Sequence, residues 1–214
     1  MVDFIFVHGW GMDSGIWEEV AAGFPDARKH YVDLGFIGNK SCESVPDFKA
    51  PIYVTHSLGT AWALKHHGQD MQALIAINGF VCFQNFADER TLKTMQRRIQ
   101  RSPEIQMEEF WRSCGFKNNL DQSLNKDRLH QGLEWLKDWD VSNILASLDI
   151  PVLSLSGGHD AILPLAQMKQ EWVAHDIKIV EEGGHILPLS HASWCIEQIE
   201  GFVSELEREC RSAI

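Results

Sequence analysis

Three side chains in this sequence, Ser57, Asp160 and His185, have the types and the order that nucleophilic catalysis needs. A serine hydroxyl attacks a carbonyl when a histidine takes its proton, and a carboxylate beside that histidine fixes its tautomer and stabilises its positive charge. The order serine, acid, histidine is one of the known chain orders of such triads. The pattern predicts Ser57 as nucleophile, His185 as general base and then general acid, and Asp160 as the orienting carboxylate.

Ser57 stands between a β-rich run and a stretch typical of a helix. The run is Ile-Tyr-Val-Thr at residues 52–55, and the helical stretch begins at about Thr60. A serine on a sharp strand-to-helix turn has a strained backbone, so the positions two before and two after it must be small. Gly59 meets this condition, whereas Thr55 is larger than the usual Gly, Ala or Ser. Taken alone, the pattern also fits an ordinary loop serine.

Asp160 and His185 each follow a short apolar run that predicts a strand. Asp160 ends the sequence Ser-Gly-Gly-His-Asp after the run at 151–156, and His185 follows two glycines after the run at 177–181. Alone, the first fits a turn-forming aspartate and the second a loop histidine. All three side chains fall at strand ends in the expected order, which favours the triad. Other histidines and acids lie off these positions: His159, His175, His191, Asp149 and Asp176.

A tetrahedral intermediate also needs backbone N–H donors already aimed at its oxyanion. One expected donor is Leu58, the residue after the serine. The other is Trp10, which follows His8 and Gly9 at the end of the first apolar run. His-Gly by itself is typical of ordinary strand-ending turns, so the prediction depends on its position in the chain.

Six apolar or β-rich runs, separated by helical or loop segments, predict the fold. Such alternation is typical of a doubly wound α/β sheet with all strands parallel. The expected strands lie near 3–8, 29–34, 52–56, 72–78, 151–156 and 177–181. Helices are expected at about 14–23, at 165–173 and from 192 onward, with an irregular crossover at 39–51. We expect a single domain over 1–214, with a small helical cap inserted at about 86–147.

Composition narrows the function classes. The formal charge of −11 and the pI near 5.3 argue against nucleic-acid binding and against binding to an anionic membrane. Five scattered cysteines give neither a disulfide framework nor a metal-binding pattern. The apolar run at 4–7 is too short for a signal peptide or a membrane span. We expect a cytoplasmic protein that needs no metal and no organic cofactor.

Several motifs together resemble a known family. They are His-Gly-Trp-Gly-Met at 8–12, Ser-Leu-Gly at 57–59, Gly-Phe-Val-Cys-Phe at 79–83, Leu-Glu-Trp-Leu-Lys-Asp at 133–138 and Gly-Gly-His-Asp at 157–160. Nearly the whole chain resembles the α/β-hydrolases, and within them the pimeloyl-[acyl-carrier protein] methyl ester esterases of biotin synthesis. The resemblance implies an α/β-hydrolase fold and a serine carboxylesterase that cleaves a methyl ester on a carrier-bound dicarboxylate chain.

The acyl pocket is expected around Ser57, where strand-end loops meet the insertion. Its predicted residues are Trp10, Cys82, Phe83, Trp111 and Trp135. The alternative for Trp111 and Trp135 is that they only hold the helices of the insertion together.

The insertion differs in charge from the rest of the chain. Residues 90–130 carry nine Lys or Arg against five Asp or Glu, so this segment is +4 while the remainder is −15. Arg97, Arg98 and Arg101 have the spacing of one helix face and its border. They fit a solvated helix face, or a patch that steers an acidic partner such as an acyl carrier protein.

Two other functions remain compatible with the sequence. The first is a general short-chain carboxylesterase or thioesterase acting on small soluble acyl compounds, without a carrier protein. The second, from another class, is a non-catalytic ligand-binding protein on the hydrolase fold. Labelling of Ser57 by a fluorophosphonate separates a catalytic protein from a binding protein.

Overall fold

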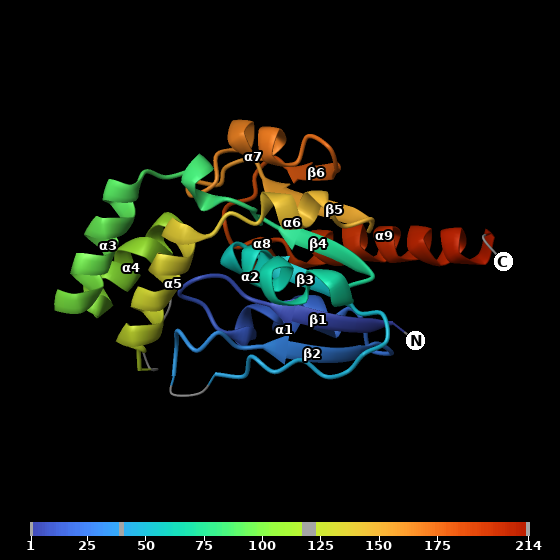
Figure 1. Ribbon diagram of the computed structural model, residues 1–214, viewed down its shortest axis with the longest axis horizontal. Helices are drawn as coiled ribbons and strands as arrows, with labels where there is room; N and C mark the ends of the chain where they lie inside the picture. Colours follow the sequence, from blue (N-terminus) through green and yellow to red (C-terminus); the bar gives the residue numbers. More distant parts are fainter. Residues whose placement is uncertain (1, 39–40, 117–122, 213–214) are drawn as a thin grey trace.

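A six-stranded sheet forms the centre of the computed structural model, which describes residues 2–38, 41–116 and 123–212. Its strands are β1 (Asp3–Val7), β2 (Arg28–Val32), β3 (Ile52–His56), β4 (Ala73–Ile77), β5 (Val152–Gly157) and β6 (Asp176–Val180). The strand order is β2-β1-β3-β4-β5-β6, and every neighbouring pair is parallel. The carboxyl ends of all six strands therefore lie at one edge of the sheet (Figure 1).

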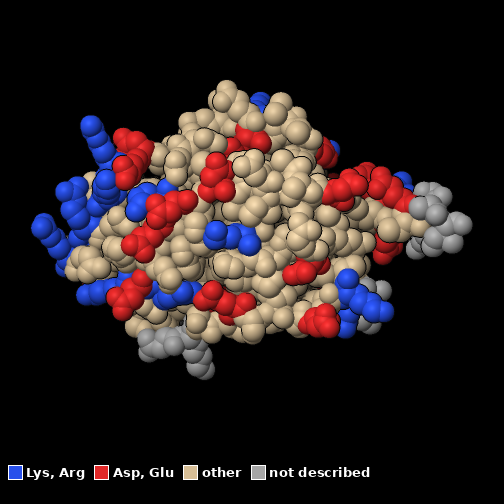
Figure 2. Space-filling view, in the orientation of Figure 1, with Lys and Arg blue, Asp and Glu red and all other residues tan. Residues whose placement is uncertain are grey.

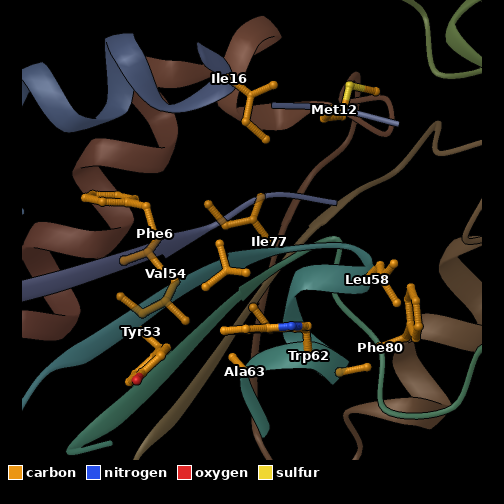
Figure 3. Packing of buried hydrophobic residues seen from close by; sticks show 14 of the residues in the cluster. Phe6, Met12, Ile16, Tyr53, Val54, Leu58, Trp62, Ala63, Ile77 and Phe80 are labelled. Carbon is orange, nitrogen blue, oxygen red and sulfur yellow. The ribbon is translucent and has the colours of Figure 1, made fainter. Parts of the chain in front are cut away.

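Helices cover both faces of the sheet. One group, whose members pack against one another, consists of α1 (Glu18–Ala22), α8 (Leu187–Ser190) and α9 (Ala192–Ser212). A second group contains α2 (Leu58–His67), which packs against β3 and α6 (Ser142–Ala146). Figure 3 shows Trp62 and Ala63 of α2 on one side of the strands and Ile16 on the other. This two-sided cover explains why β1, β3, β4 and β5 are buried along their whole length.

Three further helices lie beyond the carboxyl edge of the sheet. These cap helices are α3 (Glu89–Arg101), α4 (Pro103–Ser113) and α5 (Lys126–Asp138), and α3 packs against both of the others. Figure 1 shows them grouped at the end of the molecule toward which the strands point. Asp88 caps α3 by accepting from the N–H of Thr91, and Asn125 caps α5 by accepting from Arg128 N. Pro103 is the first residue of α4, where its missing N–H costs nothing.

The predicted fold is confirmed, and its element boundaries shift by one or two residues. The expected helix at 14–23 is instead a 3-10 turn, η1 (Ser14–Trp17), followed by the short α1. The helix ends at Ala22, close to Pro25, because the residue before a proline, here Phe24, is disfavoured in the helical conformation. The last expected helix before β6, α7 (Leu165–Glu171), ends two residues sooner than predicted.

The irregular crossover expected at 39–51 contains no helix or strand over the described residues 41–51. The only β-bridge made by these described residues is an isolated antiparallel one between Asp33 and Cys42. Residues 39–40 lie outside the described part, as do residues 117–122 of the predicted insertion. Within the described part of that insertion, regular structure is helical, and only isolated bridges touch it at Leu124 and Asp140.

Candidate active site

Ser57 lies on the sharp turn that joins β3 to α2. Its φ of 52° and ψ of −123° belong to a backbone region that residues other than glycine rarely adopt. The turn is held by two hydrogen bonds: Ser57 N donates to Ile77 O (3.2 Å), and Thr60 N donates to Ser57 O (3.0 Å). A strained residue that the surrounding structure fixes in this way is typical of a functional site.

The residues on either side of Ser57 explain why the chain can make this turn. A Cβ at Gly59 would lie 2.3 Å from the carbonyl oxygen of Val7, so only glycine fits between the helix and β1. Thr55, which is larger than the pattern prefers, turns its hydroxyl into the protein. Its Oγ1 lies 2.7 Å from Thr60 Oγ1 and donates to Ile75 O (3.1 Å), so the extra polar atom is satisfied.

The three predicted catalytic side chains are brought together in one chain of hydrogen bonds. His185 follows β6; its Nδ1 is 2.8 Å from Asp160 Oδ2, and its Nε2 is 3.2 Å from Ser57 Oγ. Because an ionised carboxylate only accepts, the proton of a neutral His185 sits on Nδ1, which leaves Nε2 to accept the serine proton. All three residues are buried. The arrangement has the geometry of a nucleophile, a base and an orienting acid.

The position and charge of Asp160 are set by its own loop. Asp160 Oδ1 accepts from Ile162 N (2.7 Å) and Leu163 N (2.9 Å), which leaves Oδ2 for His185. Burial acts to raise the pKa of the Asp160 carboxyl, but the His185 imidazole and these two N–H groups outweigh burial and hold the pKa below its usual value. Asp160 therefore stays ionised beside the histidine at neutral pH.

The loop after β1 carries Trp10, one of the two predicted oxyanion donors, and the other, Leu58, begins α2. Leu34 N donates to His8 Nε2 (2.9 Å), so the proton of the buried His8 ring is on Nδ1 and donates to Gly9 O (2.9 Å). Gly9 packs directly on the serine turn, since a Cβ there would lie 2.8 Å from Ser57 Cβ. Among the described residues, neither Trp10 N nor Leu58 N donates to a protein acceptor. Both groups are therefore free to bind an oxyanion.

A cavity of about 460 Å³ opens onto Ser57 and His185. Its volume is in the range of small-molecule sites, and its wall is mostly aromatic and aliphatic. Of the five predicted pocket residues, Trp10 and Phe83 line it. Eight lining residues were not predicted as pocket residues and come from the cap side: Phe86, Ala87, Asp88, Thr91, Leu92, Met95, Phe110 and Leu136; Ala161 and Ile162 complete the wall beside Asp160.

The other three predicted pocket residues do not line this cavity, and each has a different role. The Trp111 indole donates to Gly11 O (2.8 Å), so it fastens α4 to the loop after β1. Trp135 stacks on Trp139, with ring centroids 4.9 Å apart. Cys82 forms an isolated bridge with Asp140. These contacts tie Trp111 to the loop after β1 and Trp135 to the end of its own helix, so neither contact joins two helices of the insertion.

Three arginines predicted to bind a partner, Arg97, Arg98 and Arg101, line one surface groove of about 470 Å³ between α3 and α4. Arg98 is paired with Glu109 across the groove (2.5 Å), and Arg97 donates to Thr94 Oγ1 (3.1 Å). Figure 2 shows Lys and Arg gathered over the end of the molecule that the cap helices form. Exposed acids lie among them, so the patch is basic but mixed.

The described residues hold neither a metal-binding cluster nor a membrane-spanning helix. No group of three or more His, Cys, Asp or Glu side chains there is placed to hold a metal ion. None of the helices in the described part of the chain combines the length and the apolar character needed to cross a membrane.

A parallel sheet with a serine on a strand-to-helix turn, backed by histidine and aspartate from later strand ends, defines the α/β-hydrolase class. The sequence profile of the Alpha/beta hydrolase family matches residues 4–198, and the chain belongs to that family.

Named relatives cover nearly the whole chain at low identity. The pimeloyl-[acyl-carrier protein] methyl ester esterase of Hamiltonella defensa subsp. Acyrthosiphon pisum (strain 5AT) is 24% identical over 236 residues, covering 92% of this chain and 91% of that protein. The protein of the same name from Vibrio atlanticus (strain LGP32) is 26% identical over 252 residues, covering 95% of this chain and 92% of that protein.

Solved structures with low sequence identity share the fold. A bromoperoxidase from Bacillus anthracis superposes with a TM-score of 0.80 at 15% identity, covering 95% of this chain and 92% of that chain. A thermophilic esterase from Thermogutta terrifontis superposes with a TM-score of 0.78 at 16% identity, covering 96% of this chain and 90% of that chain. Because chemistry differs among proteins of one fold, these likenesses carry the architecture alone.

Proposed function

We propose that this protein is a serine carboxylesterase that hydrolyses the methyl ester of a carrier-bound pimeloyl-type chain. The observation that carries the proposal is the connected chain from Ser57 Oγ through His185 to Asp160 at the wall of an apolar cavity. The names of the relatives supply the substrate class, since a protein with this site could act on many acyl esters.

The proposed reaction runs in two halves. Ser57 Oγ attacks the ester carbonyl while His185 Nε2 takes its proton, and the oxyanion accepts from Trp10 N and Leu58 N. His185 then gives the proton to the departing alkoxide, so that methanol leaves and an acyl-enzyme remains. In the second half, His185 takes a proton from water, the resulting nucleophile attacks the acyl carbon, and Ser57 leaves with the proton returned. The products are a carboxylic acid and an alcohol, without any redox step.

The cavity suits the apolar part of such a substrate. Leu92, Met95 and Phe110 offer aliphatic and aromatic surface to a methylene chain, whose burial gains about 0.8 kcal/mol per CH₂ group. Asp88 lies at the exposed end of the lining. Its pKa is held below the usual value by hydrogen bonds from the backbone and side chain of Thr91, so the carboxylate is ionised. A negatively charged group of the substrate would therefore be disfavoured at that end of the cavity.

Turnover of methyl esters of graded chain length, free and carrier-bound, tests this proposal. We expect hydrolysis of both kinds, with the carrier-bound pimeloyl ester preferred by kcat/KM. Equal kcat/KM for free and carrier-bound esters would instead indicate a general carboxylesterase, and preference for the thioester bond would indicate a thioesterase. If the protein neither hydrolyses these esters nor is labelled by a fluorophosphonate at Ser57, the result would favour a non-catalytic ligand-binding protein.

The groove between α3 and α4 is the proposed docking surface for the carrier. α3 walls both spaces, because Leu92 and Met95 face the cavity while Arg97 and Arg101 line the groove. A carrier seated there would lie beside the acyl site. Acyl carrier proteins are acidic, and arginine pairs well with carboxylate and phosphate groups. The basic groove would reverse the sign of the field that the rest of this acidic chain presents.

Reversing two charges in the groove tests the docking surface. We expect Arg97→Glu combined with Arg101→Glu to lower kcat/KM for a carrier-bound ester by about tenfold or more at low salt, because steering commonly accelerates association by that factor. The loss should shrink at about 0.15 M salt, where fields are screened within about 8 Å. A small free ester should be turned over at the wild-type rate.

Arg112→Glu is the matched control for that experiment. Arg112 lies on α4, is exposed and pairs with Glu108, and it does not line the groove. Its reversal should leave the carrier-bound reaction close to wild type. Equal losses on free and carrier-bound esters would mean that Arg97 and Arg101 support the fold or the pocket instead.

A further inference from the structure

Asn78, the first residue after β4, has an unusual backbone. It is fully buried, and its φ of 42° makes it, with Ser57, one of two described residues other than glycine with positive φ. Asparagine tolerates this conformation better than most residues but still loses free energy in it. Its N–H donates to Leu155 O (2.7 Å), which ties the turn to β5. A buried strained residue calls for an explanation in its contacts.

The Asn78 side chain joins three segments that are far apart in sequence. Its Oδ1 accepts from Gly157 N at the end of β5 (2.9 Å). Its Nδ2 donates to the carbonyl oxygens of Gly184 (2.9 Å) and His185 (2.7 Å). The amide orientation is unambiguous, because a backbone N–H only donates and two backbone carbonyls only accept. Both donors and the acceptor of this amide are therefore in use.

A second buried donor reaches the same carbonyl oxygen. His56 Nε2 lies 2.9 Å from His185 O and must carry the proton, because that oxygen only accepts. His56 Nδ1 is buried without a hydrogen-bond partner. Burial, together with the charge His185 would carry, lowers the pKa of His56 to about 3, so this ring remains a neutral donor.

We propose that Asn78 is a positioning residue for the reaction, one that holds the backbone of His185 in place so that its ring spans Asp160 and Ser57. This inference rests on the proposed function. Asn78 touches no reacting atom; it acts through the loop that carries His185 and through Gly157, three residues before Asp160. The loops of the base and of the acid are thus fastened to one amide, which fixes their mutual distance.

Loss of the Asn78 amide should loosen the loop that carries His185. His185 lies in the loop between β6 and α8, and its side chain makes one hydrogen bond on each side. Without Asn78, the backbone of that loop keeps the bond from His56 but loses two others. A misplacement of about 1 Å in a catalytic group can cost about 10²-fold in rate. We expect a loss of that size in the chemical step, with little change in substrate binding.

Two substitutions separate the amide from the backbone conformation. Asn78→Gly removes all three side-chain hydrogen bonds and accepts positive φ without strain. Asn78→Asp keeps the shape and the acceptor for Gly157 N, but turns an oxygen toward two carbonyl oxygens. Leu74→Ala is the control, since Leu74 is fully buried near the other end of β4 and its truncation weakens the core without reaching the His185 loop.

The measurements are made per active site, so that loss of folded protein does not count as loss of catalysis. Complete fluorophosphonate labelling gives the number of competent sites, and the rate of labelling reports the reactivity of Ser57. For both Asn78 variants we expect kcat and the labelling rate to fall about 10²-fold per site, with KM within about threefold. Leu74→Ala should lower the melting temperature but keep wild-type values per site.

A proton NMR spectrum adds a measurement that would not change if the substitution lowered only the stability of the fold. In the wild type, the His185 Nδ1 proton shared with Asp160 should give a resonance downfield of the backbone amides. It should move upfield or broaden in Asn78→Gly and persist in Leu74→Ala. If Asn78→Gly is too unstable to titrate, Asn78→Asp decides the question by the same measurements.

Failure of this inference is distinguishable from failure of the proposed function. A wild-type protein that neither labels at Ser57 nor hydrolyses esters would remove the proposed function and this inference with it. A wild type that does both, with Asn78→Gly or Asn78→Asp reacting at the wild-type rate per site and keeping the downfield proton, would overturn the positioning role alone.

Discussion

Replacing Ser57 with alanine is expected to lower ester hydrolysis by about 10⁵–10⁶-fold, the scale of loss found when a serine hydrolase is deprived of its nucleophile. The reason is geometric: Ser57 Oγ lies 3.2 Å from His185 Nε2 and beside the apolar cavity. Among the described residues that line the cavity, the other hydroxyl belongs to Thr91, on the cap side, where it donates to Asp88 Oδ1. Residual turnover would come from the oxyanion donors and from substrate binding alone.

His185→Ala should cost nearly as much, and the double variant with Ser57→Ala little more, because the two groups act as a unit. The check is kcat/KM for a short methyl ester, beside far-UV circular dichroism to confirm folding. Alanine removes only the hydroxyl of Ser57 and adds no bulk to the tight turn. Either single variant retaining most of the activity would rule out the assignment of nucleophile and base.

The parts of the fold that could be predicted are those with local causes. Continuous apolar runs such as Phe4–Val7 predict strands buried on both faces, and their alternation with helices predicts a parallel sheet. Parallel strands bring their carboxyl ends to one edge. Knowing which loop each of Ser57, Asp160 and His185 occupies was therefore enough to predict that they meet.

The acyl cavity could be predicted only in part, because it depends on how the cap helices lie on the sheet. Trp111 has the residue type of a pocket wall, but its indole donates to Gly11 O one hundred residues away, a contact that no local pattern indicates. A usable signal did exist on α3. Leu92 and Met95 lie three residues apart on this helix and Asp88 caps it, and all three line the cavity.

The role of Asn78 was also outside the reach of sequence reasoning. An asparagine after an apolar run is typical of a turn, and nothing local indicates positive φ together with complete burial. Its three side-chain partners lie 79 to 107 residues further along the chain. Only the strand order, which places β4 beside β5 and close to the His185 loop, brings them within reach.

Replacing Asp160 with asparagine is expected to reduce kcat by about 10⁴-fold while leaving the fold intact. The two N–H groups of Ile162 and Leu163 donate to Oδ1, so an asparagine here must keep its oxygen on that side. Its NH₂ group then faces His185 Nδ1. A donor in that position requires Nδ1 to be unprotonated, which moves the ring proton to Nε2, opposite the serine. In this tautomer His185 cannot accept the proton of Ser57.

Asp176→Asn is the matched control, because Asp176 is an exposed acid that pairs with Lys178 at the start of β6, far along the strand from His185. It should keep the wild-type rate.

The measurement is kcat for a short methyl ester, together with the position of the His185 ring protons in a nitrogen-correlated spectrum. Asp160→Asn should move the ring proton from Nδ1 to Nε2. If Asp160→Asn keeps kcat within tenfold of the wild type, the Asp160 carboxylate does not set the tautomer of His185. The histidine would then be oriented mainly by its backbone contacts to Asn78 and His56.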